Sequence, residues 1–250
     1  SMFSYLEKEN ILFSNDVFGM HYATGELFDD ENDERIWLTQ AEKYYANIVL
    51  PYSDIVLRFL DQVKKMGLSP KIIAPDHGFI WRKEPSRIVS LYEKWATQAP
   101  KNKAVIVYDT MWGSTAQMAS QIADGLRAGG TAVKVLSMHS NDRSKVALEL
   151  LDASALIIGS PVLNSQIFPS MADVLCYLKG LRKKGLVGAA FGSYGWNGAP
   201  IEELTKTLES MQVEIVAPAV KSPFVPDDNI KKSCWELGKL ISQKLAEKVK

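Results

Sequence analysis

The feature that most constrains the fold is a regular alternation of short apolar runs and amphipathic segments from residue 103 onward. Strands that alternate with helices form a parallel sheet, because each crossover helix returns the chain to the same end of the sheet. The pattern therefore predicts an α/β fold with a doubly wound, five-stranded parallel sheet covered by helices on both faces. The expected strands are 104–109, 132–136, 155–159, 185–191 and 213–219, and the last helix is expected over about 228–248.

The first hundred residues lack this regularity. Short strands are expected at 10–14 and 71–74, and a long helical pattern over 41–66 contains Pro51, which should break or kink it. The acidic run 29–34 (DDENDE) is expected to be a solvated loop. A polar stretch with one proline, 98–103, suits a linker, so we expect one domain over 1–98 and a second over 103–250.

Composition excludes several classes of partner. The 250-residue chain has 29 Lys and Arg against 29 Asp and Glu, which argues against binding to nucleic acid or to a membrane surface. Cys176 and Cys234 lie in helical contexts without C-x-x-C spacing, which favours a reduced, cytoplasmic location. No apolar run approaches the ~20 residues of a membrane span. We therefore expect neither a membrane nor a nucleic-acid partner.

Three polar loops follow predicted strands. Parallel sheets bind ligands beyond the carboxyl ends of their strands, where the strand order reverses. The loops are 110–115 (TMWGST), 160–167 (SPVLNSQI) and 192–198 (GSYGWNG). The first contains no Lys or Arg, so a phosphate there would be held by backbone N–H groups at a helix N-terminus and by hydroxyls. It matches neither the P-loop nor the dinucleotide-binding G-x-G-x-x-G pattern.

Together these loops would suit a flat heteroaromatic ligand that carries a phosphate. Trp112, Tyr194 and Trp196 are the candidates for stacking, and backbone groups could bind the edge of the ring system. The alternative is three ordinary surface loops with chance aromatic residues, but their shared edge favours a binding site. The candidate residues are Thr110, Met111, Trp112, Gly113, Ser114, Thr115, Ser160, Pro161, Val162, Leu163, Asn164, Ile167, Ser193, Tyr194, Gly195, Trp196 and Gly198.

Several separated motifs resemble one family in the same order. They are Y-D-T-M-W-x-S-T, G-S-P-x-x-N and F-G-x-Y-G-W-x-G in the second part, and F-S-N-D-x-F-G-x-H, Y-Y-A-N-I-x-x-P and I-A-P-x-H-G-x-x-W-R in the first. The chain resembles the C-terminal part of the flavodiiron proteins (A-type flavoproteins). This resemblance implies the end of a metallo-β-lactamase-like domain, which carries a diiron site in that family, followed by a flavodoxin-like domain that binds FMN. The implied activity is FMN-dependent electron transfer for reduction of O2, NO or both.

The resemblance also implies two metal ligands, Asp16 as a bridging carboxylate and His77 as an imidazole ligand. The family's main ligand motif, H-x-E-x-D-H, is not found in this sequence. The diiron site would therefore be incomplete in this chain, and residues 1–100 would expose apolar surface unless another chain covers it. His21, close to Asp16, is expected to have a supporting or core role. Asp29, Asp30 or Glu34 would be the alternatives if the chain completed a site alone.

Two other functions stay open at this point. The chain could be a stand-alone flavodoxin-type electron carrier with residues 1–100 as a docking module, or a metal-dependent hydrolase, which the missing H-x-H-x-D-H motif disfavours. For the flavodiiron function, the resemblance implies an electron donor such as rubredoxin, a reduced deazaflavin or a flavin reductase. It also implies a head-to-tail homodimer or higher assembly, to which Trp81, Arg82, Trp112 and Trp196 would contribute; the alternative for Trp81 is that it packs within its own domain.

Overall fold

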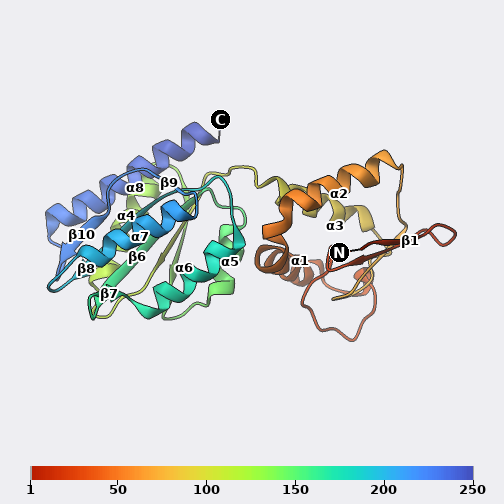
Figure 1. Ribbon diagram of the computed structural model, residues 1–250, viewed down its shortest axis with the longest axis horizontal. Helices are drawn as coiled ribbons and strands as arrows, with labels where there is room; N and C mark the ends of the chain where they lie inside the picture. Colours follow the sequence, from red (N-terminus) through yellow and green to blue (C-terminus); the bar gives the residue numbers. More distant parts are fainter. Residues whose placement is uncertain (1, 250) are drawn as a thin grey trace. The chain divides into compact units, whose positions relative to one another are not determined.

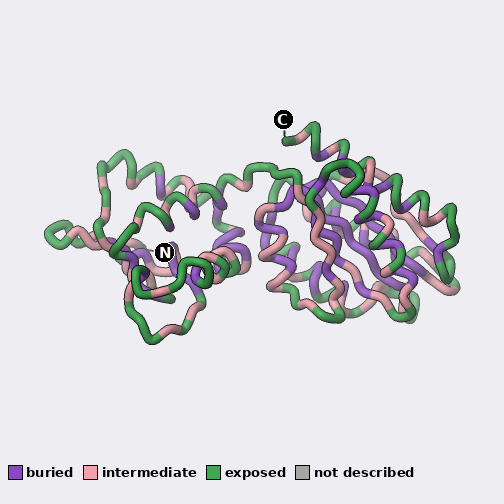
Figure 2. Tube along the Cα trace, turned by 180° about the vertical axis from the view of Figure 1, so that it is seen from behind, coloured by how far each residue is buried: buried purple, intermediate pink, exposed green. Residues whose placement is uncertain are grey.

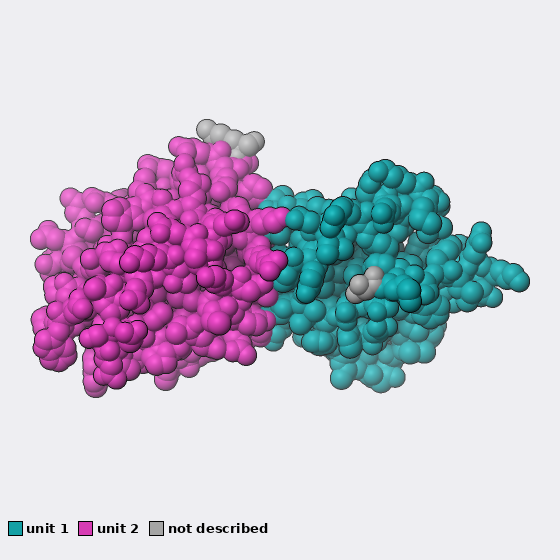
Figure 3. All heavy atoms as spheres, viewed as in Figure 1, with its two compact units in different colours: residues 1–99 teal, residues 100–250 magenta. Residues whose placement is uncertain are grey.

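The computed structural model describes residues 2–249, and the chain divides into two compact units, residues 1–99 and 100–250 (Figure 3). The elements of each unit pack into a core of its own. The assignment of the first unit as part of a metallo-β-lactamase-like domain stays a prediction.

The first unit is built on a small mixed sheet. Strand β1 (Ser4–Leu6) pairs antiparallel with β2 (Ile11–Asn15), and β2 pairs parallel with β3 (Ile72–Pro75). Alternation along β2 buries Leu12 and leaves Phe13 exposed. The helical elements are η1 (Asp29–Glu31), α1 (Glu34–Tyr44), η2 (Tyr45–Val49), η3 (Leu50–Tyr52), α2 (Ser53–Lys65) and α3 (Pro85–Thr97).

Proline interrupts the long helical pattern of the first unit, as expected. After α1 the chain passes through a π-helical turn, η2, and a 3-10 turn, η3, before α2 begins. Pro51 lies in η3, where its missing N–H group removes a helical hydrogen bond. Pro85 occupies the first turn of α3, where that N–H group has no helical partner to lose.

The second unit is a doubly wound parallel sheet, which confirms the predicted fold class. The strand order is β10-β8-β6-β4-β5, with all four pairings parallel. Helices α4 and α8 pack on one face, and α5, α6 and α7 cover the other (Figure 1). The main strands are β4 (Lys103–Tyr108), β5 (Ala132–Ser137), β6 (Ala155–Leu163), β8 (Val187–Tyr194) and β10 (Val220–Pro223). The helices are α4 (Ser114–Ala128), α5 (Arg143–Leu150), α6 (Pro169–Leu181), α7 (Ala199–Ser210) and α8 (Asp228–Lys248).

Burial explains why these strands are easy to recognise in the sequence. Helices cover both faces, so the central strands β6 and β8 are almost continuously buried (Figure 2). Strands buried on both faces are apolar without alternation, unlike the strands of the first unit. Among the described residues, no helix is both long enough and apolar enough to cross a membrane.

The last strand differs from the prediction. The expected strand over 213–219 is reduced to β9 (Glu214–Ile215), which pairs briefly with β8. Pro218 follows, and a proline cannot donate a hydrogen bond to a neighbouring strand. Pairing with β8 resumes only at β10, so the fifth strand of the sheet lies several residues later than the sequence pattern indicated.

One hairpin was not expected. Strand β6 continues beyond the predicted 155–159 to Leu163 and turns back into β7 (Gln166–Ile167). Asn164 and Ser165 form the turn, with φ angles of +49° and +58°. Two consecutive left-handed residues match the twist of a two-residue hairpin. The predicted loop 160–167 is therefore largely an ordered hairpin.

Candidate functional site

A cavity of the second unit lies at the carboxyl edge of its sheet. It has a volume of about 690 Å³ and is bordered by the turns after β4, β6, β8 and β10. Strand β4 lies between β5 and β6, so the strand order reverses beside this cavity. The lining residues are Met111, Trp112, Ser114, Pro161, Val162, Leu163, Asn164, Ser165, Ser193, Tyr194, Gly195, Trp196, Asn197 and Phe224. The structure thus brings members of all three predicted loops together.

The turn after β4 is held by its own polar groups. The buried carboxylate of Asp109 accepts hydrogen bonds from the Thr110 backbone N–H, at 2.8 Å, and from the Ser170 hydroxyl. The Thr110 hydroxyl accepts the Gly113 N–H at 3.0 Å, and Gly113 has a left-handed φ of +88°. Helix α4 begins at Ser114, so the N–H groups of its first turn remain available for an anion.

Some predicted residues lie behind the cavity wall. The Thr115 hydroxyl is buried and hydrogen-bonds the Ser193 hydroxyl at 2.9 Å, which ties the turn after β4 to the end of β8. The Ser160 hydroxyl accepts the Phe168 N–H at 2.9 Å, and Ile167 pairs with Val162 in the hairpin. Thr110 and Gly113 shape the first turn, and a side chain at Gly198 would collide with the Tyr194 ring. Direct ligand binding by these residues stays a prediction.

Aromatic rings surround the cavity without packing against one another. The exposed fractions of Trp112, Trp196 and Phe224 are 92%, 99% and 69%, and among the described residues none of the three has a ring partner. Such exposure is costly for apolar rings unless a ligand or partner covers them. Phe224 was missed because its strand was placed too early in the sequence. Asn197, whose side chain accepts the Ala199 N–H at 2.9 Å, and Ser165 lay inside predicted loops without being singled out.

A second candidate site pairs Asp16 with His77 in the first unit. The parallel neighbours β2 and β3 end at the same edge, so the residues that follow them meet. His77 Nε2 lies 3.3 Å from Asp16 Oδ1, and both side chains are about half exposed. The Tyr44 hydroxyl donates to the same Asp16 oxygen at 3.3 Å. Burial, reinforced by the negative charge of Asp16, raises the pKa of Tyr44 well above its ordinary value, so its phenol stays neutral and donates.

These residues do not by themselves form a diiron site. Among residues 2–249, no group of three or more His, Cys, Asp or Glu side chains is placed to hold a metal ion. His21 is exposed rather than in the core, and its ring lies edge-on to Tyr44 at 4.8 Å and 5.5 Å from the His77 ring. One carboxylate and one imidazole supply only part of the ligand set that two irons require.

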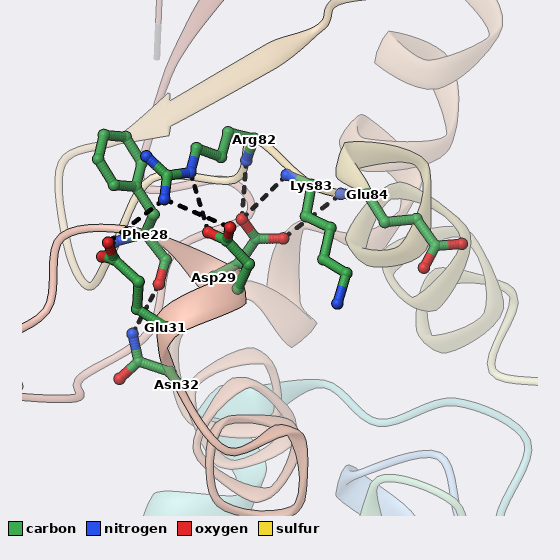
Figure 4. Close-up of polar contacts among 8 residues, drawn as sticks. Phe28, Asp29, Glu31, Asn32, Arg82, Lys83 and Glu84 are labelled. Carbon is green, nitrogen blue, oxygen red and sulfur yellow. Dashed lines mark hydrogen bonds and ion pairs between the residues drawn. The ribbon is translucent and has the colours of Figure 1, made fainter.

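The acidic segment is more ordered than the sequence indicated. Asp29 is buried, and its carboxylate accepts the backbone N–H groups of Arg82, Lys83 and Glu84 at 2.8, 3.1 and 3.4 Å (Figure 4). The Arg82 guanidinium pairs with Asp30 at 2.9 Å. The expectation of a solvated loop is therefore wrong for Asp29, because its carboxylate anchors the turn before α3.

Trp81 does not have the surface position that an interface role requires. Its side chain is buried, and its Nε1–H donates to the Phe18 carbonyl at 2.8 Å. Of the two alternatives for Trp81, packing within its own domain is confirmed and a contribution to a subunit interface is wrong, because this ring belongs to the core of the first unit. Arg82, Trp112 and Trp196 do keep exposed side chains.

Comparison with known proteins first establishes the class of protein. A sequence model of the family described as Flavodoxin matches residues 106–238, within the second unit. The nitric oxide reductase of Moorella thermoacetica is 44% identical over 248 residues, which are 99% of this chain and 62% of the relative. The solved rubredoxin oxygen:oxidoreductase of Desulfovibrio gigas superposes with a TM-score of 0.96 at 37% identity over 100% of this chain and 63% of the other.

A second solved structure, the flavodiiron protein of Giardia intestinalis, has a TM-score of 0.92 at 29% identity and covers 100% of this chain and 62% of its own. The chain therefore belongs to the flavodoxin family, and its resemblance to the flavodiiron proteins, which the motifs predicted, is confirmed along nearly its whole length. It spans a little over three fifths of the length of these relatives.

Proposed function

We propose that this chain binds FMN in the cavity at the edge of the second unit and passes electrons within a flavodiiron reductase of O2, NO or both. The observation that carries this proposal is the cavity itself. Exposed aromatic rings border it on more than one side, and a helix N-terminus with hydroxyls, but without Lys or Arg, lies at its edge. The flavodoxin match and the names of the relatives support the same function.

The residues of the chain have distinct roles in this proposal. The first-turn N–H groups of α4 and the hydroxyls of Ser114 and Thr110 would hold the terminal phosphate. Trp112 and Trp196 would cover the flavin ring system, and the hairpin after β6 would contact its edge. When bound, FMN supplies reversible one- and two-electron transfer. By analogy with the Desulfovibrio relative, a rubredoxin is one candidate donor, and a flavin or deazaflavin donor is the alternative.

The iron site that we propose follows from the number of ligands that this chain supplies. Asp16 and His77 would contribute two ligands, and the remaining ligands would come from protein outside this sequence. We propose a head-to-tail dimer or higher assembly in which the flavin of one subunit serves the metal site of another, and a cytoplasmic location. The stand-alone electron carrier remains the second candidate, because the cavity is formed entirely by the second unit.

Flavin retention tests the first step of this proposal. Purified protein mixed with FMN should retain it in equilibrium dialysis at micromolar concentration and should quench its fluorescence. Trp112→Ala should weaken binding about tenfold, since stacking and burial of one ring contribute on the order of 1 kcal/mol. Trp235→Ala is the matched control, because that tryptophan lies on α8 away from the cavity. Failure of the unaltered protein to retain FMN would end the proposal.

Iron binding separates the two candidate functions. The chain alone should bind Fe²⁺ weakly and below two equivalents, because the described residues form no larger ligand cluster. Adding a polypeptide that carries the H-x-E-x-D-H motif should raise iron content and restore O2 or NO reduction, and Asp16→Asn should abolish that gain. An electron carrier would retain FMN and reversible redox activity, with no response to the added polypeptide.

A further inference from the structure

Phe224 combines an unusual backbone with an unusual exposure. It directly follows β10, and its φ of +55° places it in the left-handed region, which bulky side chains rarely adopt. Its N–H donates to the Tyr194 carbonyl at 2.8 Å, which continues the pairing of β10 with β8 by one residue. The β10–β8 pairing thus holds the backbone in this conformation, while the large apolar ring remains exposed.

The ring of Phe224 is placed at the cavity. It is among the lining side chains, and its Cε1 atom lies 3.8 Å from the position that a Cβ on Gly195 would occupy. Gly195 follows β8, so the ring extends the wall that the residues after β8 begin. It has no ring partner in the described part of the chain. Strained residues persist where the surrounding structure holds them, and they cluster at ligand-binding sites.

We propose that Phe224 is a flavin-contacting residue that forms a further aromatic wall of the cavity, contributed by the turn after β10, and that it excludes water from the ligand beside Gly195. This inference rests on the proposed function, because it takes FMN as the occupant. It explains why the strained conformation is retained, since a glycine would relieve the strain and remove the wall.

Phe224→Gly tests this inference because its two expected effects have opposite signs. Without FMN, the variant should be at least as stable as the unaltered protein in urea denaturation, because glycine adopts positive φ without steric cost. With FMN, dialysis should give a Kd about tenfold weaker, and the flavin absorption bands should shift toward those of free FMN. Phe224→Tyr should restore both affinity and spectrum.

Val225→Ala is the matched control, because Val225 is the adjacent exposed residue and does not line the cavity. It should leave affinity and spectrum unchanged. If the unaltered protein binds FMN and Phe224→Gly binds it with the same Kd and spectrum, the inference is overturned while the proposed function stands. Equal losses in the Phe224 and Val225 variants would also overturn it, because the effect would then belong to the turn as a whole. If the unaltered protein binds no FMN, the proposed function fails first.

Discussion

The two units use their aromatic residues in opposite ways. In the first unit, rings pack against rings in two clusters. Tyr45, Tyr92 and Trp95 are in mutual contact in one, and Trp37 lies edge-on to Phe79 and Trp81 in the other. In the second unit, Trp112, Trp196 and Phe224 stand apart around a cavity. Rings that contact one another stabilise a fold, whereas isolated exposed rings indicate a surface that binds something.

The sheets of the two units differ in how well their faces are covered, and here it is the second unit that leaves less apolar surface exposed. The central strands of the second unit are buried on both faces, so its core is complete. In the first unit, Leu6 and Phe13 are each 46% exposed on one face of the sheet, together with the half-buried Ile11 and Ile72. The second unit therefore combines a complete core with an open cavity, whereas the first combines a dense aromatic core with an uncovered sheet face.

Separating the units would test this comparison with the largest expected effect. Residues 100–250 expressed alone should unfold cooperatively in urea and retain FMN, because their core does not need other residues. Residues 1–99 alone should aggregate or unfold without a sharp transition, since a small domain with an uncovered apolar face is marginal. Circular dichroism and light scattering would report both results. A sharp two-state transition in the 1–99 fragment would contradict the distinction drawn here.

A helix contact in the second unit should show how completely its core is packed. Gly125 of α4 faces α8 so closely that an added Cβ would lie 2.0 Å from the Trp235 carbonyl oxygen. Gly125→Ala should therefore lower the free energy of unfolding by about 3 kcal/mol, the upper end for overpacking, because backbone must move. Gly180→Ala on α6 is the matched control, since nothing lies within 4 Å of its added Cβ. That control should be neutral or stabilising by about 0.5–1 kcal/mol, as urea denaturation would measure.

Buried charge gives a contrast between the units that depends on pH. Asp29 in the first unit accepts three backbone N–H groups, whereas the buried Lys183 ammonium in the second unit donates to the Leu151 carbonyl at 3.1 Å. Burial lowers the pKa of Lys183 from 10.5 to about 8. Between these values the unfolded chain binds more protons than the folded one, so this group makes stability rise with pH. Below about pH 8 the cost of the buried charge is fully present.

Lys183→Met should therefore stabilise the protein at pH 7 by up to about 3 kcal/mol, with a gain that shrinks as pH rises toward 10.5. Urea denaturation of both proteins across this range isolates the contribution of Lys183 from other alkaline effects. Asp29→Asn serves as the comparison, since it should destabilise by leaving N–H groups less well paired. A constant difference between wild type and the Lys183 variant at all pH values would contradict this account.

The second unit was largely predictable because its strands are buried on both faces and its helices are regular. The pattern gave α8 and the turn after β4 nearly residue for residue. It failed where local chemistry overrides apolar periodicity. Pro218 interrupts the expected fifth strand, which therefore lies later in the sequence. Asn164 and Ser165, both with positive φ, form the turn of a hairpin that was not expected. The error in the fifth strand also explains why Phe224 was not predicted. The candidate residues follow the ends of predicted strands, and the fifth strand was expected to end at residue 219, whereas β10 ends at Pro223.

The first unit was predictable only in part. Its strands and the break at Pro51 follow from composition, but the burial of Asp29 and Trp81 depends on contacts between segments more than fifty residues apart. Asp16 and His77 meet because β2 and β3 are parallel neighbours, a pairing that the sequence pattern does not specify. The resemblance placed these two residues in one site, whereas residue chemistry alone would have left them separate.

The close contact between α4 and α8 has a consequence for synthesis of the protein. Helix α4 emerges from the ribosome early in the synthesis of the second unit. Helix α8, which packs against Gly125 of α4, is encoded about a hundred residues later. Until residues 228–248 have emerged, that face of the sheet is covered by α4 alone, and the core that α4 shares with α8, which includes Met118, Ile122 and Leu126, is incomplete. Folding of the second unit therefore finishes only after α8 is made, and a chain that ends near residue 225 would keep apolar surface of this core exposed.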